Sequence, residues 1–144
     1  MARIKLNLPD HYSFVAYIPV RITDINYGGH VGNDIFLSIL HEARVQYLGY
    51  YGFKEFGIGG FGLIMTDVAI EFKSELFYGD KIKASVSAGE FSKIGFDIFY
   101  KLEKESAEKF TLVARAKTGM IFYDYATRKI KDMPKDFESA FCPR

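Results

Sequence analysis

The run from Asp24 to Asp34 gathers residue types that can do chemistry. It carries carboxylates at both ends, amides at Asn26 and Asn33, and one histidine, His30, set among glycines. Glycines let backbone N–H groups approach a ligand closely, and a helix that begins here points unpaired N–H groups and a partial positive charge outward. Such a loop can bind a carbonyl oxygen that gains negative charge during a reaction. The pattern therefore predicts an active-site loop.

A strand is expected before this loop and a long helix after it. Between positions 12 and 22 the even residues are apolar, which is the period of a strand, and Pro19 favours an edge position. From Asp34 to about Tyr51 the apolar residues recur with a helical period, with Asn33 or Asp34 as the expected cap and Gly52 as the stop. The expected apolar face comprises Phe36, Ile39, Leu40, Ala43, Tyr47 and Tyr50, and the expected polar face Ser38, His41, Glu42, Arg44 and Gln46.

Four more strands are expected after the glycine-rich break at 57–60. Alternating apolar residues predict them at 64–72, 82–88, 94–102 and 110–122, and Pro134 could open a last helical turn through Phe141. The connections are short and polar, as in antiparallel hairpins. We therefore predict an α+β fold over 1–144 as a single domain, with an antiparallel β-α-β-β-β-β sheet wrapped around one long helix. The far side of the sheet and its edges would suit self-association.

Composition excludes several classes of function. The chain has 144 residues, a formal net charge of +1 and 49% hydrophobic residues, so it offers no electrostatic case for nucleic acid or an anionic membrane. One cysteine, Cys142, is expected to be a free thiol and suits a cytoplasmic location, as does the lack of a signal peptide or long apolar run. The histidines lack metal-ligand spacing and no nucleotide motif occurs, so no metal or cofactor is expected.

Several segments, taken in order, resemble one known family. They are Val20–Asn26, His30–Asn33, Glu42–Arg44, Glu71-Phe72, Gly79–Ile82, Ala114–Thr118, Arg128–Ile130 and Met133-Pro134. Over about Val15 to Phe137 the chain resembles the hot-dog fold thioesterases of the 4-hydroxybenzoyl-CoA thioesterase type. The resemblance implies action on acyl-CoA or acyl-carrier-protein thioesters. It also implies a homodimer or homotetramer with active sites between two subunits.

The resemblance also implies roles within the loop. The first backbone N–H groups of the helix would polarise the thioester carbonyl, and by position this is the N–H of Asn33, helped by Gly29 or Gly32. Asp24 matches the first acid of the family's Asp-x-Asp motif and is expected to hold the loop through backbone N–H groups.

One residue departs from the family pattern. The second acid of that motif is the nucleophile or general base, and here the position holds Asn26. A neutral amide can orient a water or the thioester, but it cannot take up a proton near neutral pH. The catalytic assignment of the family therefore does not transfer to this position.

Three residues are candidates for the missing base. His30 matches the histidine of the His-Val-Asn-Asn pattern of acyl-ACP thioesterase relatives, and imidazole suits proton transfer. Asp34 is the second candidate, with helix capping as its alternative role. Glu42 is the third, with a solvated place on the polar helix face as its alternative. We take His30 as the base and Asn26 as the group that orients water or thioester.

The remaining charged candidates lie on strands. Asp67 interrupts an apolar stretch and could reach a dimer-related site, although an outward-facing position is the simpler interpretation. Lys73, Lys93, Arg115 and Lys117 could contact CoA phosphates or simply form the solvated face of the sheet.

Three functions remain open at this stage. The first is an acyl-thioester hydrolase, and the second is a non-catalytic acyl-CoA or fatty-acyl binding protein that has lost the catalytic acid. A hydratase or dehydratase acting on an acyl thioester ranks last, because the expected histidine-plus-acid motif is absent. The sequence does not specify the acyl group.

Overall fold

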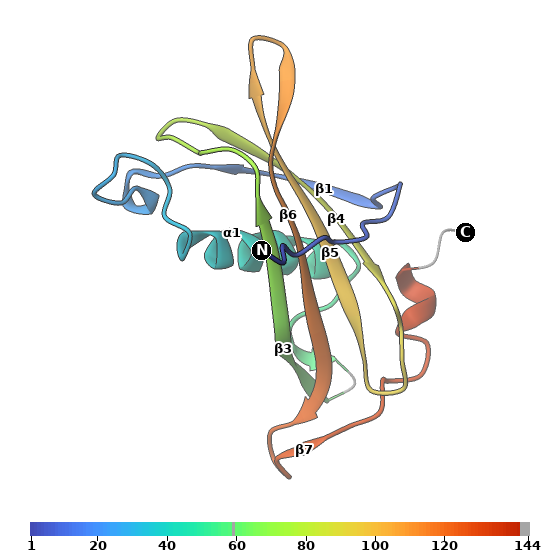
Figure 1. The fold of residues 1–144 in the computed structure, drawn as a ribbon. Coiled ribbons are helices and arrows are strands. Elements are labelled where there is room, and N and C mark those ends of the chain that lie inside the picture. The colour runs from blue at the N-terminus through green and yellow to red at the C-terminus, as the bar shows by residue number, and fades with distance from the viewer. Residues whose placement is uncertain (59, 142–144) are drawn as a thin grey trace.

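The computed structural model describes residues 1–58 and 60–141, so Cys142 lies outside the described residues. The chain forms one long helix and a set of strands, joined by short turns (Figure 1). Their bounds are β1 Phe14–Pro19, α1 Ile35–Tyr50, β2 Phe56–Ile58, β3 Phe61–Phe72, β4 Lys81–Gly89, β5 Gly95–Ser106, β6 Lys109–Asp124 and β7 Lys129–Ile130, with 3-10 turns η1 Ile22–Asp24 and η2 Glu138–Phe141.

The strands form one antiparallel sheet in the order β1-β4-β5-β6-β3-β2, and β7 pairs with the end of β6. Helix α1 lies against one face of this sheet (Figure 1). The predicted α+β architecture, with one helix wrapped by an antiparallel sheet, is confirmed. So is the edge position of the first strand, because β1 ends the sheet and Pro19 is its last residue.

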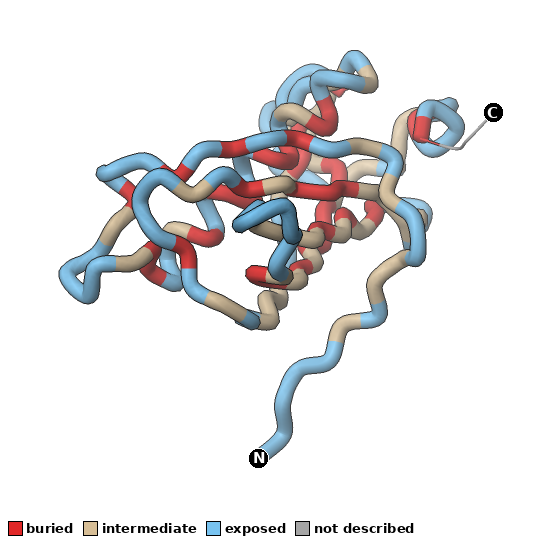
Figure 2. Tube along the Cα trace, turned by 90° about the horizontal axis from the view of Figure 1, so that it is seen from above, coloured by how far each residue is buried: buried red, intermediate tan, exposed pale blue. Residues whose placement is uncertain are grey.

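The core lies between α1 and the sheet. Leu40, Ala43 and Tyr47 are buried on the helix, and every second residue of β5, such as Ile98 and Tyr100, is buried beneath them. Buried residues are therefore concentrated where helix and sheet meet, whereas the N-terminal segment runs away from the body exposed (Figure 2).

Three details differ from the sequence expectation. The first strand is shorter than predicted because the chain turns into η1 at Ile22, which is 65% exposed. Tyr50 is exposed rather than on the apolar face. Arg44, expected on the polar face, is buried: its Nε donates to Oε1 of Glu55 at 2.5 Å, so its charge is paired inside the protein.

Two short strands were not predicted. The segment around β2 was interpreted only as a glycine-rich break, yet its residues pair with the start of β3. The pair Lys129-Ile130 is too short to carry a period, and it becomes a strand only because β6 extends far enough to pair with it. The expected helical turn from Pro134 is instead a turn followed by η2.

Helix α1 is closed at its C-terminal end. Gly52 adopts a φ of 85°, its N–H donates to the carbonyl of Gly49 at 3.0 Å, and the N–H of Phe53 donates to the carbonyl of Leu48 at 2.8 Å. This is a Schellman cap, in which glycine supplies the left-handed residue. The predicted stop at Gly52 is therefore confirmed.

Aromatic rings cover this capped end. Phe141 packs on Tyr47, Tyr51 and Phe53, with ring centroids 4.8 to 5.6 Å apart. The Tyr47 hydroxyl accepts the N–H of Ala88 at 2.9 Å, and burial raises the pKa of Tyr47 to about 12. The C-terminal η2 turn thus seals the gap between helix and sheet at this end.

Candidate functional site

The loop before α1 is closed by its own hydrogen bonds. Ile25 and Val31 form an antiparallel bridge, and the N–H of Asn26 donates to the carbonyl of His30 at 2.9 Å. The Asn26 side-chain Oδ1 accepts the N–H of Gly28 at 2.9 Å, a turn in which an amide mimics backbone. Gly29 has a φ of 83°, a left-handed conformation that glycine adopts without strain.

This loop is anchored to the connection between β3 and β4. The N–H of Val31 donates to the carbonyl of Leu76 at 2.9 Å, which brings the two segments side by side. Between them and the start of α1 lies a pocket of 250 Å³. It is lined by His30, Val31, Asn33, Phe36, Phe72, Lys73, Ser74 and Glu75.

His30 is held in one orientation at this pocket. Its Nδ1 lies 3.1 Å from the carbonyl oxygen of Val31, and its Nε2 lies 3.9 Å from Oε1 of Glu75. A carbonyl oxygen only accepts hydrogen bonds, so we assign the proton of the neutral imidazole to Nδ1. Nε2 then keeps a free lone pair next to a carboxylate.

The N-terminal end of α1 is open. Within residues 1–58 and 60–141 the backbone N–H of Asn33 donates to no protein group. Asp34 occupies the cap position, but its side chain makes no capping hydrogen bond. Asp34 is therefore the N-cap residue, as predicted, but its side chain does not supply the hydrogen bond that usually accompanies this position. Donor groups and the positive end of the helix dipole remain available at the pocket.

Asn26 and Asp34 lie beside each other across Gly32. A Cβ atom on Gly32 would lie 2.5 Å from Oδ1 of Asp34 and 3.4 Å from Nδ2 of Asn26. Only glycine fits here while both side chains keep their places. The structure thus puts a carboxylate, that of Asp34, close to the position where Asn26 replaces the expected acid.

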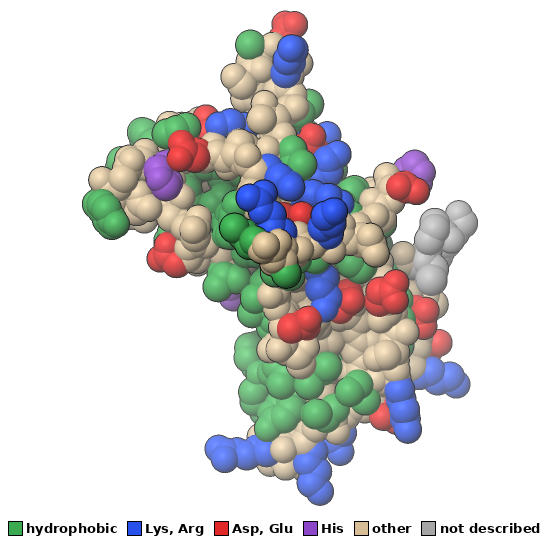
Figure 3. Space-filling view, viewed as in Figure 1, with side chains coloured by type: hydrophobic (Ala, Val, Ile, Leu, Met, Phe, Trp, Pro, Cys, Tyr) green, Lys and Arg blue, Asp and Glu red, His purple; other side chains and the backbone are tan. Residues whose placement is uncertain are grey.

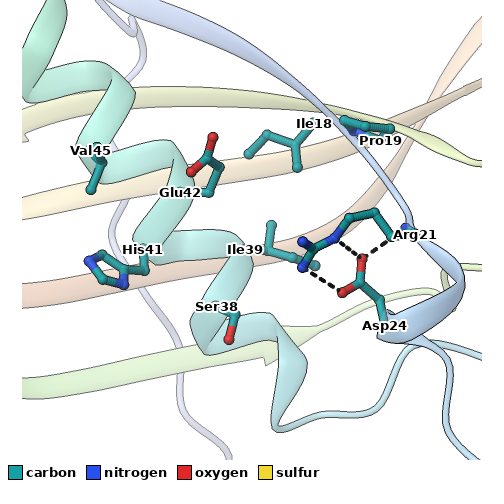
Figure 4. Close-up of a pocket in the computed structure, with 9 residues that line it drawn as sticks. All are labelled: Ile18, Pro19, Arg21, Asp24, Ser38, Ile39, His41, Glu42 and Val45. Atoms are coloured by element: carbon teal, nitrogen blue, oxygen red, sulfur yellow. Dashed lines mark hydrogen bonds and ion pairs between the residues drawn. The ribbon is translucent and has the colours of Figure 1, made fainter.

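Asp24 and Glu42 belong to a different surface. Both line an open groove of 420 Å³ between α1, the end of β1 and η1 (Figure 4). Asp24 is buried and accepts the N–H of Arg21 at 2.8 Å, and this hydrogen-bonded, charged partner raises the pKa of Arg21. Glu42 accepts from Gln46 at 2.9 Å. Neither carboxylate lines the pocket that contains His30.

Asp67 lies on the sheet face opposite α1, at a β-bulge in β3. It pairs with Lys117 at 2.6 Å, and Lys117 also lies 3.3 Å from Asp97. The hydrogen bond from Lys117 lowers the pKa of Asp67, whereas burial raises the pKa of Asp97. Burial opposes the charge on Lys117, but the hydrogen bonds and charges of its two carboxylates outweigh it and raise its pKa.

Two other basic residues considered for CoA phosphates, Lys73 and Arg115, lie on different surfaces of the protein. Lys73 lines the His30 pocket, whereas Arg115 is held by Glu71 and by the carbonyl of Leu6 on the outer sheet face. In the described part of the chain, no three potential ligand side chains gather as a metal ion would require. Among those same residues, no helix has the length and hydropathy to cross a bilayer.

Sequence reasoning missed Ser74 and Glu75 as pocket residues. They follow β3 without any motif, and only the long-range bond from Val31 to Leu76 brings them to His30. The one available signal is the neighbouring Lys73, a candidate for contact with CoA phosphates that lines the same pocket.

Solved structures share this architecture. The 1,4-dihydroxy-2-naphthoyl-CoA thioesterase Slr0204 from Synechocystis matches with a TM-score of 0.78 and 24% identity, covering 90% of this chain and 95% of that one. The 4-hydroxybenzoyl-CoA thioesterase from Pseudomonas sp. strain CBS-3 matches with a TM-score of 0.80 and 17% identity, covering 90% and 99%. At these identities the matches show the fold, which is the hot-dog fold.

A third match is an Asp-to-Asn mutant of 4-hydroxybenzoyl-CoA thioesterase complexed with 4-hydroxybenzoyl-CoA. It has a TM-score of 0.81 and 16% identity, and the match covers 90% of this chain and 98% of that one. Among curated proteins no significant match is found. The sequence itself, over residues 20–141, fits the profile of one family, and the chain belongs to that family, the thioesterase-like superfamily.

Proposed function

We propose that this protein hydrolyses an acyl thioester, carried by CoA or by an acyl-carrier protein, at the pocket in front of α1. Family membership supports thioester hydrolysis as the class of reaction. The observation that carries the proposal is that His30 lines the same 250 Å³ pocket as Asn33, whose backbone N–H has no partner within the described residues. One pocket is therefore lined both by a residue that can accept a proton and by a residue that can donate to an oxyanion.

His30 is the general base in this proposal. Its Nε2 removes a proton from a water molecule as the water oxygen attacks the thioester carbonyl carbon. Nδ1 keeps its own proton and donates it in a hydrogen bond to the Val31 carbonyl oxygen. Glu75, 3.9 Å from Nε2, favours the imidazolium that results. When the tetrahedral intermediate collapses, the C–S bond breaks and the departing thiolate takes the proton from His30.

The helix terminus supplies the oxyanion site. The N–H of Asn33 would donate to the carbonyl oxygen, and the dipole of α1 favours the negative charge that forms there. Gly29 has open space where a side chain would stand, so a ligand can approach the loop backbone there, whereas Gly32 lets the Asn26 and Asp34 side chains lie close to the backbone. One donor of this kind typically contributes about 3 kcal/mol to transition-state binding.

Asn26 and Asp34 complete the proposed catalytic group. Asn26 fixes the loop through Gly28 and leaves Nδ2 free to orient water or thioester. Asp34 offers a carboxylate near this amide and is the alternative base if His30 serves only to bind. Asp24 stabilises the start of the loop by accepting the N–H of Arg21. Glu42 lines the neighbouring groove and has no catalytic role in this proposal.

A second copy of the chain would complete the site. Met65, Val68 and Phe72 of β3 lie on the α1 side of the sheet, yet they are 38 to 47% exposed. The edge of β3 from Thr66 to Phe72 pairs with no strand within the described residues. An unpaired edge next to an apolar stripe suits a homodimer formed through β3, and Asp67 would then lie at that interface.

Thiol release from short, long and aromatic acyl-CoAs tests the proposal, with His30→Ala beside wild type. We expect turnover by the wild type and a fall in kcat on the order of 100-fold in His30→Ala, without loss of folding. His11→Ala is the matched control, because His11 is exposed and lies outside the pocket. Unchanged turnover in His30→Ala would remove His30 as the base and transfer the role to Asp34.

A non-catalytic acyl-CoA binding protein is the second candidate, and the amide at Asn26 favours it. In that case calorimetry detects acyl-CoA binding while no free thiol appears over hours. Asn26→Asp sharpens the distinction, since it restores the carboxylate of the family motif. Thiol release that appears only in this variant would mean that the natural chain binds thioesters without cleaving them.

A further inference from the structure

The end of the sheet farthest from the His30 pocket carries an exposed aromatic and aliphatic surface. Phe56 is 67% exposed and its ring centroid lies 5.4 Å from that of Tyr125, which in turn lies 5.1 Å from Tyr123. Ile130 pairs with Tyr123 across the β6–β7 hairpin and is 53% exposed. We call this surface, together with Arg128 and Lys129, the β7 corner.

The β7 corner is cationic at its tip. Arg128 and Lys129 are exposed and form no ion pair within residues 1–58 and 60–141. The nearest acid in sequence, Asp124, is occupied by the turn itself, where its Oδ1 accepts the N–H groups of Ala126 and Thr127. Figure 3 shows Lys and Arg side chains projecting at the lower end of the molecule, below a hydrophobic area.

The shape of this surface favours a large partner. The hairpin projects from the end of β6 (Figure 1), and its side chains line neither the 250 Å³ pocket nor the 420 Å³ groove. Aromatic and arginine side chains on a projecting surface are typical anchors of protein interfaces, and unpaired cations steer an acidic partner toward them. We propose that the β7 corner docks an acidic carrier protein that bears the acyl thioester.

Dimer symmetry places this corner near a catalytic pocket. Two identical β3 edges related by a two-fold axis must pair antiparallel. Pairing centred on Ala69, the middle of the unpaired edge from Thr66 to Phe72, would put Phe72, which lines the pocket, opposite the partner subunit's Thr66. The partner subunit's Gly62, which lies under its Phe56 and Tyr125, is then only about 13 Å farther along the strand. This step rests on the proposed function and on its β3 dimer.

The test compares two thioester carriers. The kcat/KM of the full chain is measured with the same acyl group on CoA and on a holo acyl-carrier protein, for wild type and for Arg128→Glu/Lys129→Glu. We expect the ratio of carrier-protein to CoA kcat/KM to fall by about tenfold or more in the double variant, and less at high salt. Arg3→Glu/Lys109→Glu is the control, because it makes the same change in net charge with exposed cations outside the corner.

The other outcomes separate failure of the docking from failure of the proposed function. An equal loss on both carriers would mean that the corner acts on hydrolysis itself, a loss on CoA alone would mean that it binds the CoA nucleotide, and unchanged kcat/KM values on both would mean that it binds neither carrier. Hydrolysis of acyl-CoA with none of acyl-carrier protein leaves the proposed function standing and refutes the docking. If neither carrier is hydrolysed, the proposed function fails, and calorimetry with the carrier protein still decides whether the corner binds it. Loss of pelleting with phosphatidylglycerol vesicles, with carrier-protein binding intact, would assign the corner to a lipid surface.

Discussion

The two ends of α1 differ in whether their backbone polar groups are capped. At the C-terminal end a left-handed Gly52 and the N–H of Phe53 satisfy the last carbonyls, and Phe141 packs over the turn. At the N-terminal end the Asp34 side chain makes no capping hydrogen bond, and Asn33, whose N–H has no partner within the described residues, lines a pocket. One end is closed and apolar, whereas the other is open and polar.

This difference separates stability from chemistry along one helix. A helix end that is capped and covered contributes to folding, because its polar groups are paired and its rings are buried. An uncapped end keeps donors free for a ligand at a cost in helix stability. Substitutions at the C-terminal end are therefore expected to change stability alone, and those at the N-terminal end to change turnover alone.

Phe141→Ala is the largest expected change in stability. The ring is 8% exposed and contacts several aromatic rings at the closed end, so its removal should lower the free energy of unfolding by about 3 kcal/mol. Urea unfolding measures the loss, and thiol release should give an unchanged kcat for the folded fraction. A fall in kcat at full folding would mean that the closed end also serves the pocket.

Two glycines near the closed end should respond in opposite directions. Gly52→Ala forces a side chain into a φ of 85° and should cost about 1–2 kcal/mol, whereas Gly49→Ala, in the helix with open space around it, should gain about 1 kcal/mol. Thermal unfolding of both variants beside wild type checks the pair. Equal effects would contradict the assigned cap.

Asp34→Ala should have almost no effect on stability. Removal of a working N-cap side chain usually costs about 1 kcal/mol, but Asp34 makes no such bond, so a change within about 0.3 kcal/mol is expected. Urea unfolding at neutral pH measures it. A loss near 1 kcal/mol would mean that Asp34 caps the helix in solution and that the two ends are alike.

Much of the fold could be predicted from the sequence, because long elements repeat their pattern many times. The helix expected from Asp34 to about Tyr51 agrees closely with α1, Ile35–Tyr50. Arg44 and Tyr50 were misplaced, since helical period alone does not reveal that the buried Arg44 forms an ion pair with Glu55. The strands β2 and β7 were missed because two or three residues hold no period and depend on neighbours distant in sequence.

Sequence alone predicts the part of the candidate site whose residues lie close together along the chain. His30, Val31 and Asn33 of the loop line one pocket, whereas Asn26, Gly29, Gly32 and Asp34 are not among its lining residues. For Glu42 and Asp67 the sequence left a solvated or outward-facing position open beside a role in the site, and the structure puts both on other surfaces. Ser74 and Glu75 escaped because a backbone bond between distant segments, Val31 to Leu76, carries no sequence signal.

The most direct measurement of the central claim is the kcat of Asn33→Pro relative to Asn33→Ala. Proline removes the backbone N–H that is proposed to hold the oxyanion, whereas alanine removes only the side chain. With melting temperatures matched to wild type, the account predicts a loss on the order of 100-fold in the proline variant and little change in the alanine variant. Equal turnover by the two folded variants would contradict the claim that the open end of α1 performs the chemistry.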